Sequence, residues 1–252
     1  MSQDPKDRSL GPDPSAGPWQ AVIDIGTNSV LLLVARRRAR GLEIALDRAT
    51  ITRLGKDVAR TGVLAPDAIA RTLAVLREYR EVAAGYGATP LAVTTEGVRL
   101  ARNQGDFLGP AAEVLGSPVR LLSGAEEAEL SYRSVADEVE GGPLRVLDIG
   151  GGSTELAVGE GVRLLSSVSH PIGAVRLTER LVSADPPRPE EVAAIEAVAL
   201  ETLQRGQPLP PHPVLHGLAG TVTTAAALLL GLSAYDRERV DGSRFSAAHV
   251  RE

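Results

Sequence analysis

Short hydrophobic runs and amphipathic segments alternate along the chain, and the same order occurs twice. Runs of this length, rich in valine, isoleucine and leucine and bounded by glycine or polar residues, are typical of β-strands. They predict three strands in the first half, at residues 21–25, 30–37 and 42–51, and three in the second half, at 144–149, 154–158 and 162–168. Each half is therefore expected to open with a meander of strands.

The segments after these meanders show the 3.6-residue period of amphipathic helices. Residues 66–85 carry their hydrophobic side chains on one face and end at Gly85, and residues 190–205 repeat this arrangement before Gly206. Further strands are predicted at residues 91–93, 119–122 and 214–218, and further helices at 123–139 and 222–230. Strands that alternate with helices indicate an α/β fold.

A glycine-rich segment separates the two halves. Residues 140–143 read Glu-Gly-Gly-Pro, which is typical of a linker. We therefore expect a first domain at residues 19–140 and a second domain at residues 144–252. Residues 1–18 are rich in proline, glycine, serine and aspartate and predict a disordered tail.

One strand of the second half ends in a motif that can carry chemistry. Asp148 closes the hydrophobic run, and glycines at 150–152 precede Ser153, Thr154 and Glu155. Glycines let the backbone turn with positive φ and bring N–H groups close to a ligand, commonly a phosphate. A carboxylate at the end of a strand can bind a divalent cation. The alternative is a β-turn that needs glycine only for its geometry.

A second copy of this motif favours the functional interpretation. Residues 22–34 align with residues 146–158 at one constant offset, and both segments carry an aspartate at the same place, Asp24 and Asp148. The chain is thus predicted to be internally duplicated. Two such strand-turn-strand units, facing each other across a cleft, could hold a phosphorylated ligand and its metal.

Composition narrows the class of protein. The 252 residues are 43% hydrophobic with a net charge of −5, which permits a sizeable core and argues against general affinity for nucleic acid or an anionic membrane. The absence of cysteine excludes disulfides and thiolate metal sites. Neither a signal peptide nor a hydrophobic stretch of transmembrane length occurs, so a cytoplasmic protein is expected.

Shorter segments accompany the two motifs, at residues 54–62, 123–128, 171–177, 220–221 and 240–242. In this order and spacing, from Gln20 to about Phe245, they resemble the exopolyphosphatase / guanosine pentaphosphate phosphohydrolase family, a branch of the actin-like, sugar-kinase-like ATPase superfamily. The resemblance implies duplicated actin-like (ribonuclease H-like) domains. Each would hold a mixed five-stranded sheet flanked by helices, with a cleft between the two halves.

The resemblance also implies roles for individual residues. Asp24 and Asp148 would hold Mg²⁺, Glu126 would act as general base, and Glu155 matches a second glutamate of the family. The implied phosphate-binding residues are Thr27, Asn28, Ser29, Thr95, Arg99, Asn103, Gly151, Gly152, Ser153, Thr154, Gly220 and Thr221. From the residues alone, the spacing of Ser123 and Glu126 favours a capping box, in which the glutamate only binds the backbone. This alternative stays open.

Two positions depart from the family pattern. Glu96 stands in a Thr-Glu-Gly sequence where relatives usually have Thr-Ser-Ala, and Ala219 replaces the first glycine of a Gly-Gly-Thr turn. An extra carboxylate beside a polyanion would repel it unless the side chain points away or binds metal.

The leading hypothesis is a Mg²⁺-dependent phosphohydrolase that releases terminal phosphate from inorganic polyphosphate. A guanosine pentaphosphate phosphohydrolase is a close alternative, because both substrates end in a phosphoanhydride. Two further alternatives are a small-molecule kinase of the same superfamily and a sensor that binds polyphosphate or an alarmone without turnover. A homodimer is also expected from the resemblance, and no nucleic-acid or membrane partner is expected.

Overall fold

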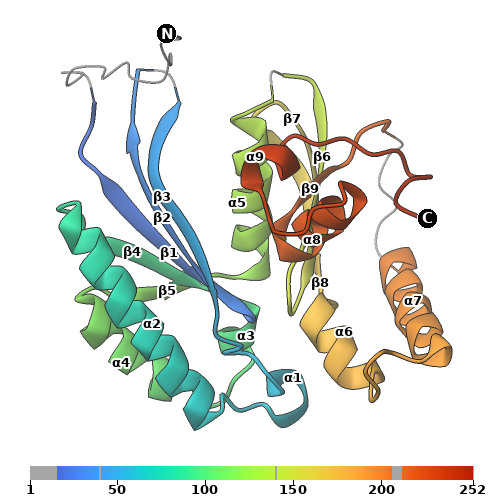
Figure 1. Ribbon diagram of the computed structural model, residues 1–252, viewed down its shortest axis with the longest axis horizontal. Helices are drawn as coiled ribbons and strands as arrows, with labels where there is room; N and C mark the ends of the chain where they lie inside the picture. Colours follow the sequence, from blue (N-terminus) through green and yellow to red (C-terminus); the bar gives the residue numbers. More distant parts are fainter. Residues whose placement is uncertain (1–15, 40, 140, 206–211, 252) are drawn as a thin grey trace, which may run out of the picture.

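The computed structural model describes residues 16–39, 41–139, 141–205 and 212–251, which form two lobes, each built on a β-sheet (Figure 1). The tail that the sequence predicts to be disordered, residues 1–18, lies outside the described residues except for residues 16–18.

The first sheet has five strands in the order β3-β2-β1-β4-β5. Its strands are β1 (Gln20–Ile25), β2 (Ser29–Arg37), β3 (Leu42–Ile51), β4 (Pro90–Thr94) and β5 (Val119–Leu121). The strands β1, β2 and β3 form an antiparallel meander, while β4 pairs parallel with β1 and β5 pairs parallel with β4. This is the mixed five-stranded sheet that the resemblance implies.

Two helices, α2 (Pro66–Gly85) and α4 (Gly105–Leu115), lie on one face of this sheet (Figure 1). Alternate residues of the strands point toward them, and Ile23 and Leu32 are fully buried in the resulting core with Leu76 of α2. A proline at the first position of α2 suits a helix start, because its φ is already helical and its missing N–H would have no helical partner. The short helices α1 (Val58–Thr61) and α3 (Glu96–Arg99) complete this lobe.

The second sheet has the order β8-β7-β6-β9. Its strands are β6 (Pro143–Ile149), β7 (Thr154–Glu160), β8 (Arg163–His170) and β9 (His216–Leu218). The meander and the parallel strand repeat the plan of the first sheet. Where five strands were expected, this sheet has four within the described residues, because the chain after β9 continues as α8 (Ala219–Leu229) and α9 (Arg237–Val240).

The helix α5 (Gly124–Ala136) follows β5 but packs against β6, β7 and β8 of the second sheet. Tyr132 and Val135 of this helix form the second core with Leu144 and Val146. The predicted first domain, residues 19–140, included this helix because it precedes the glycine-rich linker. Its packing instead places it with the second sheet, so the chain passes between the lobes near the start of α5.

The remaining helices are α6 (Ala174–Leu181) and α7 (Pro189–Gln204), of which α7 matches the helix predicted at residues 190–205. The sequence predicts a turn at 219–221, but α8 already begins at Ala219. No helix in the described ranges is long and apolar enough to cross a membrane.

Candidate active site

Each meander has the same tight turn between its first two strands. The N–H of Gly26 donates to the carbonyl of Ser29 at 2.9 Å, and the N–H of Gly150 donates to the carbonyl of Ser153 at 3.0 Å. We call residues 26–29 the first phosphate loop and residues 150–153 the second phosphate loop. Their common geometry confirms the internal duplication that the sequence predicts.

The two phosphate loops meet between the lobes. A Cβ atom added to Gly151 would lie 3.4 Å from Asn28 Cβ, and one added to Gly152 would lie 2.9 Å from Thr27 Oγ1. Gly152 is therefore needed for the close approach of the two loops, while Gly151 lies at contact distance from the first loop. Thr27, Asn28, Gly151 and Gly152 all lie where the loops meet, as a shared phosphate site requires.

The two aspartates of the loop strands face the same space and interact electrostatically. Burial, followed by the charge of Asp148, raises the pKa of Asp24 to about 6. Burial also raises the pKa of Asp148, whose Oδ2 accepts a 2.5 Å hydrogen bond from Ser131 of α5. Oδ1 of Asp24 is buried and has no hydrogen-bond partner among the described residues.

An unpaired, buried carboxylate oxygen is a fitting ligand for a hard cation. Within the ranges that the structure describes, no three His, Cys, Asp or Glu side chains are grouped to hold a metal. Mg²⁺ commonly uses one or two carboxylates and completes its shell with water and substrate phosphate. The pair Asp24 and Asp148 therefore fits Mg²⁺ better than a cation that needs a cage of protein ligands.

Glu155 lies opposite Asp148 in the register of β6 and β7, so the two side chains share one face of the sheet. It is buried, and Ser169 of β8 donates a 2.6 Å hydrogen bond to its Oε1. Burial raises the pKa of Glu155 to about 7, a value at which a carboxylate can accept a proton near neutral pH.

Glu126, the general base implied by the resemblance, is used as a helix cap. Its carboxylate accepts hydrogen bonds from the N–H and hydroxyl of Ser123, at 2.8 and 2.9 Å, and pairs with Arg120. The backbone N–H of Ser123, then its hydroxyl and Arg120, lower the pKa of Glu126 to about 2. Such a carboxylate is a weak base, so the geometry supports the capping-box alternative.

The next residue, Glu127, lies among the site carboxylates, and the sequence reasoning missed it. Its Oε2 accepts a 2.9 Å hydrogen bond from Arg99, and its side chain is mostly buried. Burial raises its pKa, with smaller contributions from the negative charges of Glu96 and Asp24, while Arg99 opposes the rise. The sequence feature that could have pointed to Glu127 is the Glu-Glu pair. The second glutamate lies about 100° further round the helix than the first, so its side chain points in a different direction.

Two of the predicted phosphate ligands bind other groups of the protein. The side-chain amide of Asn103 accepts from the N–H of Leu64 at 2.8 Å and donates to its carbonyl at 3.1 Å, so Asn103 holds the backbone there. The hydroxyl of Thr154 donates to the carbonyl of Ile172 at 2.7 Å. The structure thus gives Asn103 and Thr154 supporting positions.

Other predicted ligands remain beside the site. The guanidinium group of Arg99 is oriented by the hydrogen bonds that it donates to the carbonyl of Leu122 and to Glu127. Thr95 follows β4 directly, and Ser29 is the last residue of the first phosphate loop and the first residue of β2. Ser153, in the second loop, is buried.

The predicted phosphate ligands Gly220 and Thr221 lie at the same edge of the second sheet as Asp148. Leu218 of β9 pairs in parallel with Asp148, so Gly220 and Thr221 follow at the carboxyl end of the neighbouring strand. Ala219 has φ of 67°, a left-handed conformation that favours glycine. Alanine is therefore held here in a conformation that the glycine of the family pattern would adopt more easily.

Two lobes built on similar sheets, whose glycine-containing turns and carboxylates meet between them, are typical of the actin-like fold. The chain belongs to the Ppx/GppA phosphatase family, whose model matches residues 33–250.

Proteins of similar sequence and structure support this family assignment. Exopolyphosphatase 2 of Mycobacterium tuberculosis is 41% identical over 247 residues, which cover 92% of this chain and 77% of the relative. The crystal structure of an exopolyphosphatase-like protein has a TM-score of 0.86 at 33% identity, covering 93% of this chain and 76% of the other. A Ppx-GppA enzyme of Aquifex aeolicus has a TM-score of 0.75 at 36% identity, covering 93% and 78%.

Proposed function

We propose that this protein is an exopolyphosphatase, which releases the terminal phosphate of inorganic polyphosphate by attack of water. The observation that carries the proposal is the meeting of two phosphate loops with four carboxylates, Asp24, Glu127, Asp148 and Glu155, which come from both halves of the chain and influence one another's pKa. The exopolyphosphatase relative supports the choice of substrate.

Binding of the terminal phosphate is assigned to the two phosphate loops and to Arg99. Backbone N–H groups of glycine-rich turns suit phosphate oxygens, and a guanidinium group can donate two parallel hydrogen bonds to them. Glu127 and the carbonyl of Leu122 hold Arg99 in place for this contact. Bound Mg²⁺, held by Asp24 and Asp148, would neutralise charge on the phosphate.

We assign Glu127 as the base that accepts the proton of the attacking water. Glu155 is the second carboxylate that can take part in this proton transfer. Both carboxyl groups have raised pKa values and therefore bind a proton more readily than ordinary glutamates. Glu127 is preferred because it contacts Arg99, the proposed ligand of the terminal phosphate, and so lies beside the reacting group. Glu126 is excluded from the role by its place in the capping box.

The assignment is tested by two neighbouring substitutions. Glu127→Gln keeps the size of the side chain and removes its basicity, so kcat for phosphate release from polyphosphate should fall by about 10²–10⁴-fold. Glu126→Gln is the matched control and should retain the wild-type kcat, because the amide still caps the helix. A loss of kcat in Glu126→Gln with full activity in Glu127→Gln would overturn the assignment.

The substrate is tested in the same assay with guanosine pentaphosphate beside polyphosphate, with Mg²⁺ and with a chelator. Magnesium-dependent release from polyphosphate is expected, and preferential release from guanosine pentaphosphate would move the proposal to that substrate. Binding of either substrate without release would support the sensor, and transfer from ATP to a sugar would support the kinase.

A further inference from the structure

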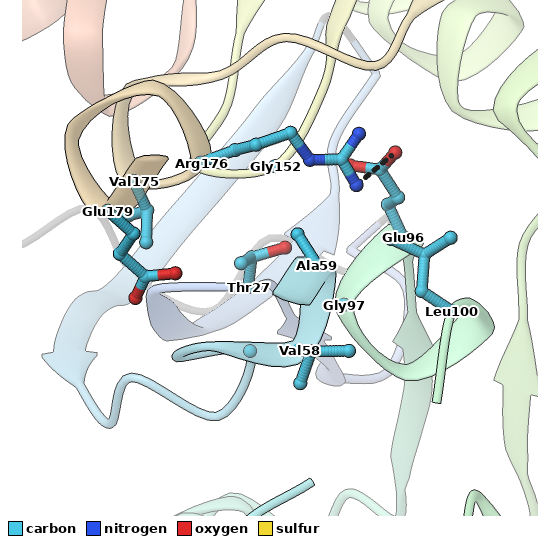
Figure 2. Close-up of a pocket in the computed structure, with 11 residues that line it drawn as sticks. Thr27, Val58, Ala59, Glu96, Gly97, Leu100, Gly152, Val175, Arg176 and Glu179 are labelled. Atoms are coloured by element: carbon cyan, nitrogen blue, oxygen red, sulfur yellow. Dashed lines mark ion pairs between the residues drawn. The ribbon is translucent and has the colours of Figure 1, made fainter. Parts of the chain in front are cut away.

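The extra carboxylate of Glu96 is neither turned away from the cleft nor left without a partner. It begins α3, is 7% exposed, and pairs with Arg176 of α6 in the opposite lobe, with 3.1 Å between Oε1 and Nη2. Figure 2 shows the two side chains reaching toward each other from different lobes. The negative charge that should repel a polyanion is therefore balanced by a cation across the cleft.

This ion pair lies where the two phosphate loops meet. A Cβ atom on Gly152 would collide with Oε2 of Glu96, and one on Gly97 would lie 3.0 Å from Thr27 Oγ1. These residues and Arg176 surround a small cavity of about 10 Å³ (Figure 2). A space of this size is at the lower limit for one water molecule.

Arg176 is also bonded to the second phosphate loop through its backbone. Its N–H donates to the carbonyl of Gly151 at 3.0 Å, and its side chain donates to the carbonyl of Pro171 at 2.8 Å. A continuous path therefore runs from Glu96 in the first lobe, through Arg176, to the second phosphate loop. A second contact lies on the same helix, where Glu179 accepts a 3.0 Å hydrogen bond from the N–H of Asp57.

The ion pair is poorly arranged for stability alone. Oε2 of Glu96 and Nε of Arg176 are both buried and lack hydrogen-bond partners within the described residues. Buried ion pairs repay their desolvation only when such atoms are satisfied. Incomplete pairing of this kind needs an explanation other than stability.

We propose that Glu96 and Arg176 are positioning residues, a pair across the cleft that sets the second phosphate loop against the first during polyphosphate hydrolysis. The inference rests on the proposed function. It also explains how this chain tolerates a glutamate at a polyanion site: Arg176 neutralises the glutamate as well as orienting the loop.

The two partners differ in charge, so their loss has opposite consequences for substrate binding. Glu96→Gln leaves the positive charge of Arg176 uncompensated, and KM for polyphosphate should stay the same or decrease. Arg176→Gln leaves the negative charge of Glu96 uncompensated, and KM should increase about threefold to tenfold at low salt, less at high salt. Both variants should lose about tenfold or more in kcat, because loop displacement affects the reacting groups.

The double variant Glu96→Gln with Arg176→Gln restores neutrality without restoring the link. Its KM should return toward the wild-type value while its kcat stays low. The control is Glu191→Gln, which removes a glutamate as buried as Glu96 from an ion pair with Arg188 inside the second lobe. This control should change neither constant by more than its effect on thermal unfolding explains.

Hydrogen–deuterium exchange supplies a readout that does not need turnover. Amide exchange at residues 150–153 should be faster in Glu96→Gln and Arg176→Gln than in wild type or Glu191→Gln. KM changes of the same sign in both variants, or unchanged exchange in this loop, would overturn the proposal. If the wild type releases no phosphate, the proposed function fails, and the exchange measurement still decides the role of the pair.

Discussion

Replacing Gly173 by alanine tests whether the second phosphate loop must lie where the structure places it. Gly173 precedes α6 with φ of −156° and ψ of 166°, an extended conformation that alanine adopts without strain. The added Cβ would, however, lie 2.5 Å from the carbonyl oxygen of Gly151 and 2.7 Å from the carbonyl carbon of Gly152. Any effect of the substitution therefore arises from contact with the loop.

The size of the effect follows from the distance that the loop must move. The contact has to lengthen from 2.5 Å to at least 3.0 Å, and to 3.4 Å for ordinary van der Waals contact. A displacement of roughly 0.5–0.9 Å approaches the 1 Å misplacement that can cost about 100-fold in rate. We expect kcat/KM for polyphosphate to fall about 10–100-fold, with a loss of about 1–3 kcal/mol in the free energy of unfolding.

Phosphate release and thermal unfolding should be measured together, with Gly109→Ala as control. Gly109 lies inside α4 with nothing within 4 Å of an added Cβ. This control should keep full activity and gain about 0.5–1 kcal/mol of stability, because alanine favours a helix. A folded Gly173→Ala protein with the wild-type kcat/KM would refute the reasoning that loop position limits the reaction.

Three further predictions concern ionisation, metal and backbone strain. Burial raises the pKa of Glu155 to about 7 from an ordinary 4.5, so the folded state binds this proton more tightly than the unfolded state. The free energy of unfolding should therefore fall by up to roughly 3 kcal/mol as pH rises from about 4.5 to above 7. Urea unfolding in chelator at pH 5 and 8 should show a smaller fall for Glu155→Gln, and an unchanged fall would contradict the assigned burial cost. Asp24→Asn should abolish the increase in Tm caused by Mg²⁺, and a full increase in that variant would exclude Asp24 as a ligand. Ala219→Gly should raise the free energy of unfolding by roughly 0.5–1 kcal/mol, because glycine accepts the left-handed φ of 67°, and a loss of stability would contradict this reasoning.

Elements stabilised by local patterns could be predicted from the sequence. The strand at 42–51 and the helix at 66–85 have the predicted bounds. The pattern of hydrophobic and polar residues, which alternates in a strand and repeats every 3.6 residues in a helix, determines them together with nearby turn residues. The helix α4 was not predicted, since Gly105, Gly109 and Pro110 weaken its local preference. It forms where Phe107 and Leu115 are buried in the first core, a contact that no local pattern reports.

The candidate site divides in the same way. Asp24, Asp148 and the glycines of both loops carry a repeated local signature, and the structure brings them together. Glu127 and Ser131 carry none, because their positions depend on how α5 is rotated against the second sheet. The resemblance assigns Glu126 as the base, whereas its local capping signal predicts the contacts that it makes.

The helix α5 explains why one glutamate of the pair enters the site and the other does not. Glu127 and Ser131 are four residues apart and lie on one face, where Glu127 pairs with Arg99 of the first lobe and Ser131 donates to Asp148 of the second. Ser123 fixes the start of the helix by holding Glu126 in the capping box, so the rotation that directs Glu127 inward also holds Glu126 outward. One turn of α5 thus contacts both lobes, and it couples the proposed base, Glu127, to a proposed metal ligand, Asp148. A change that rotates this turn should disturb both at once.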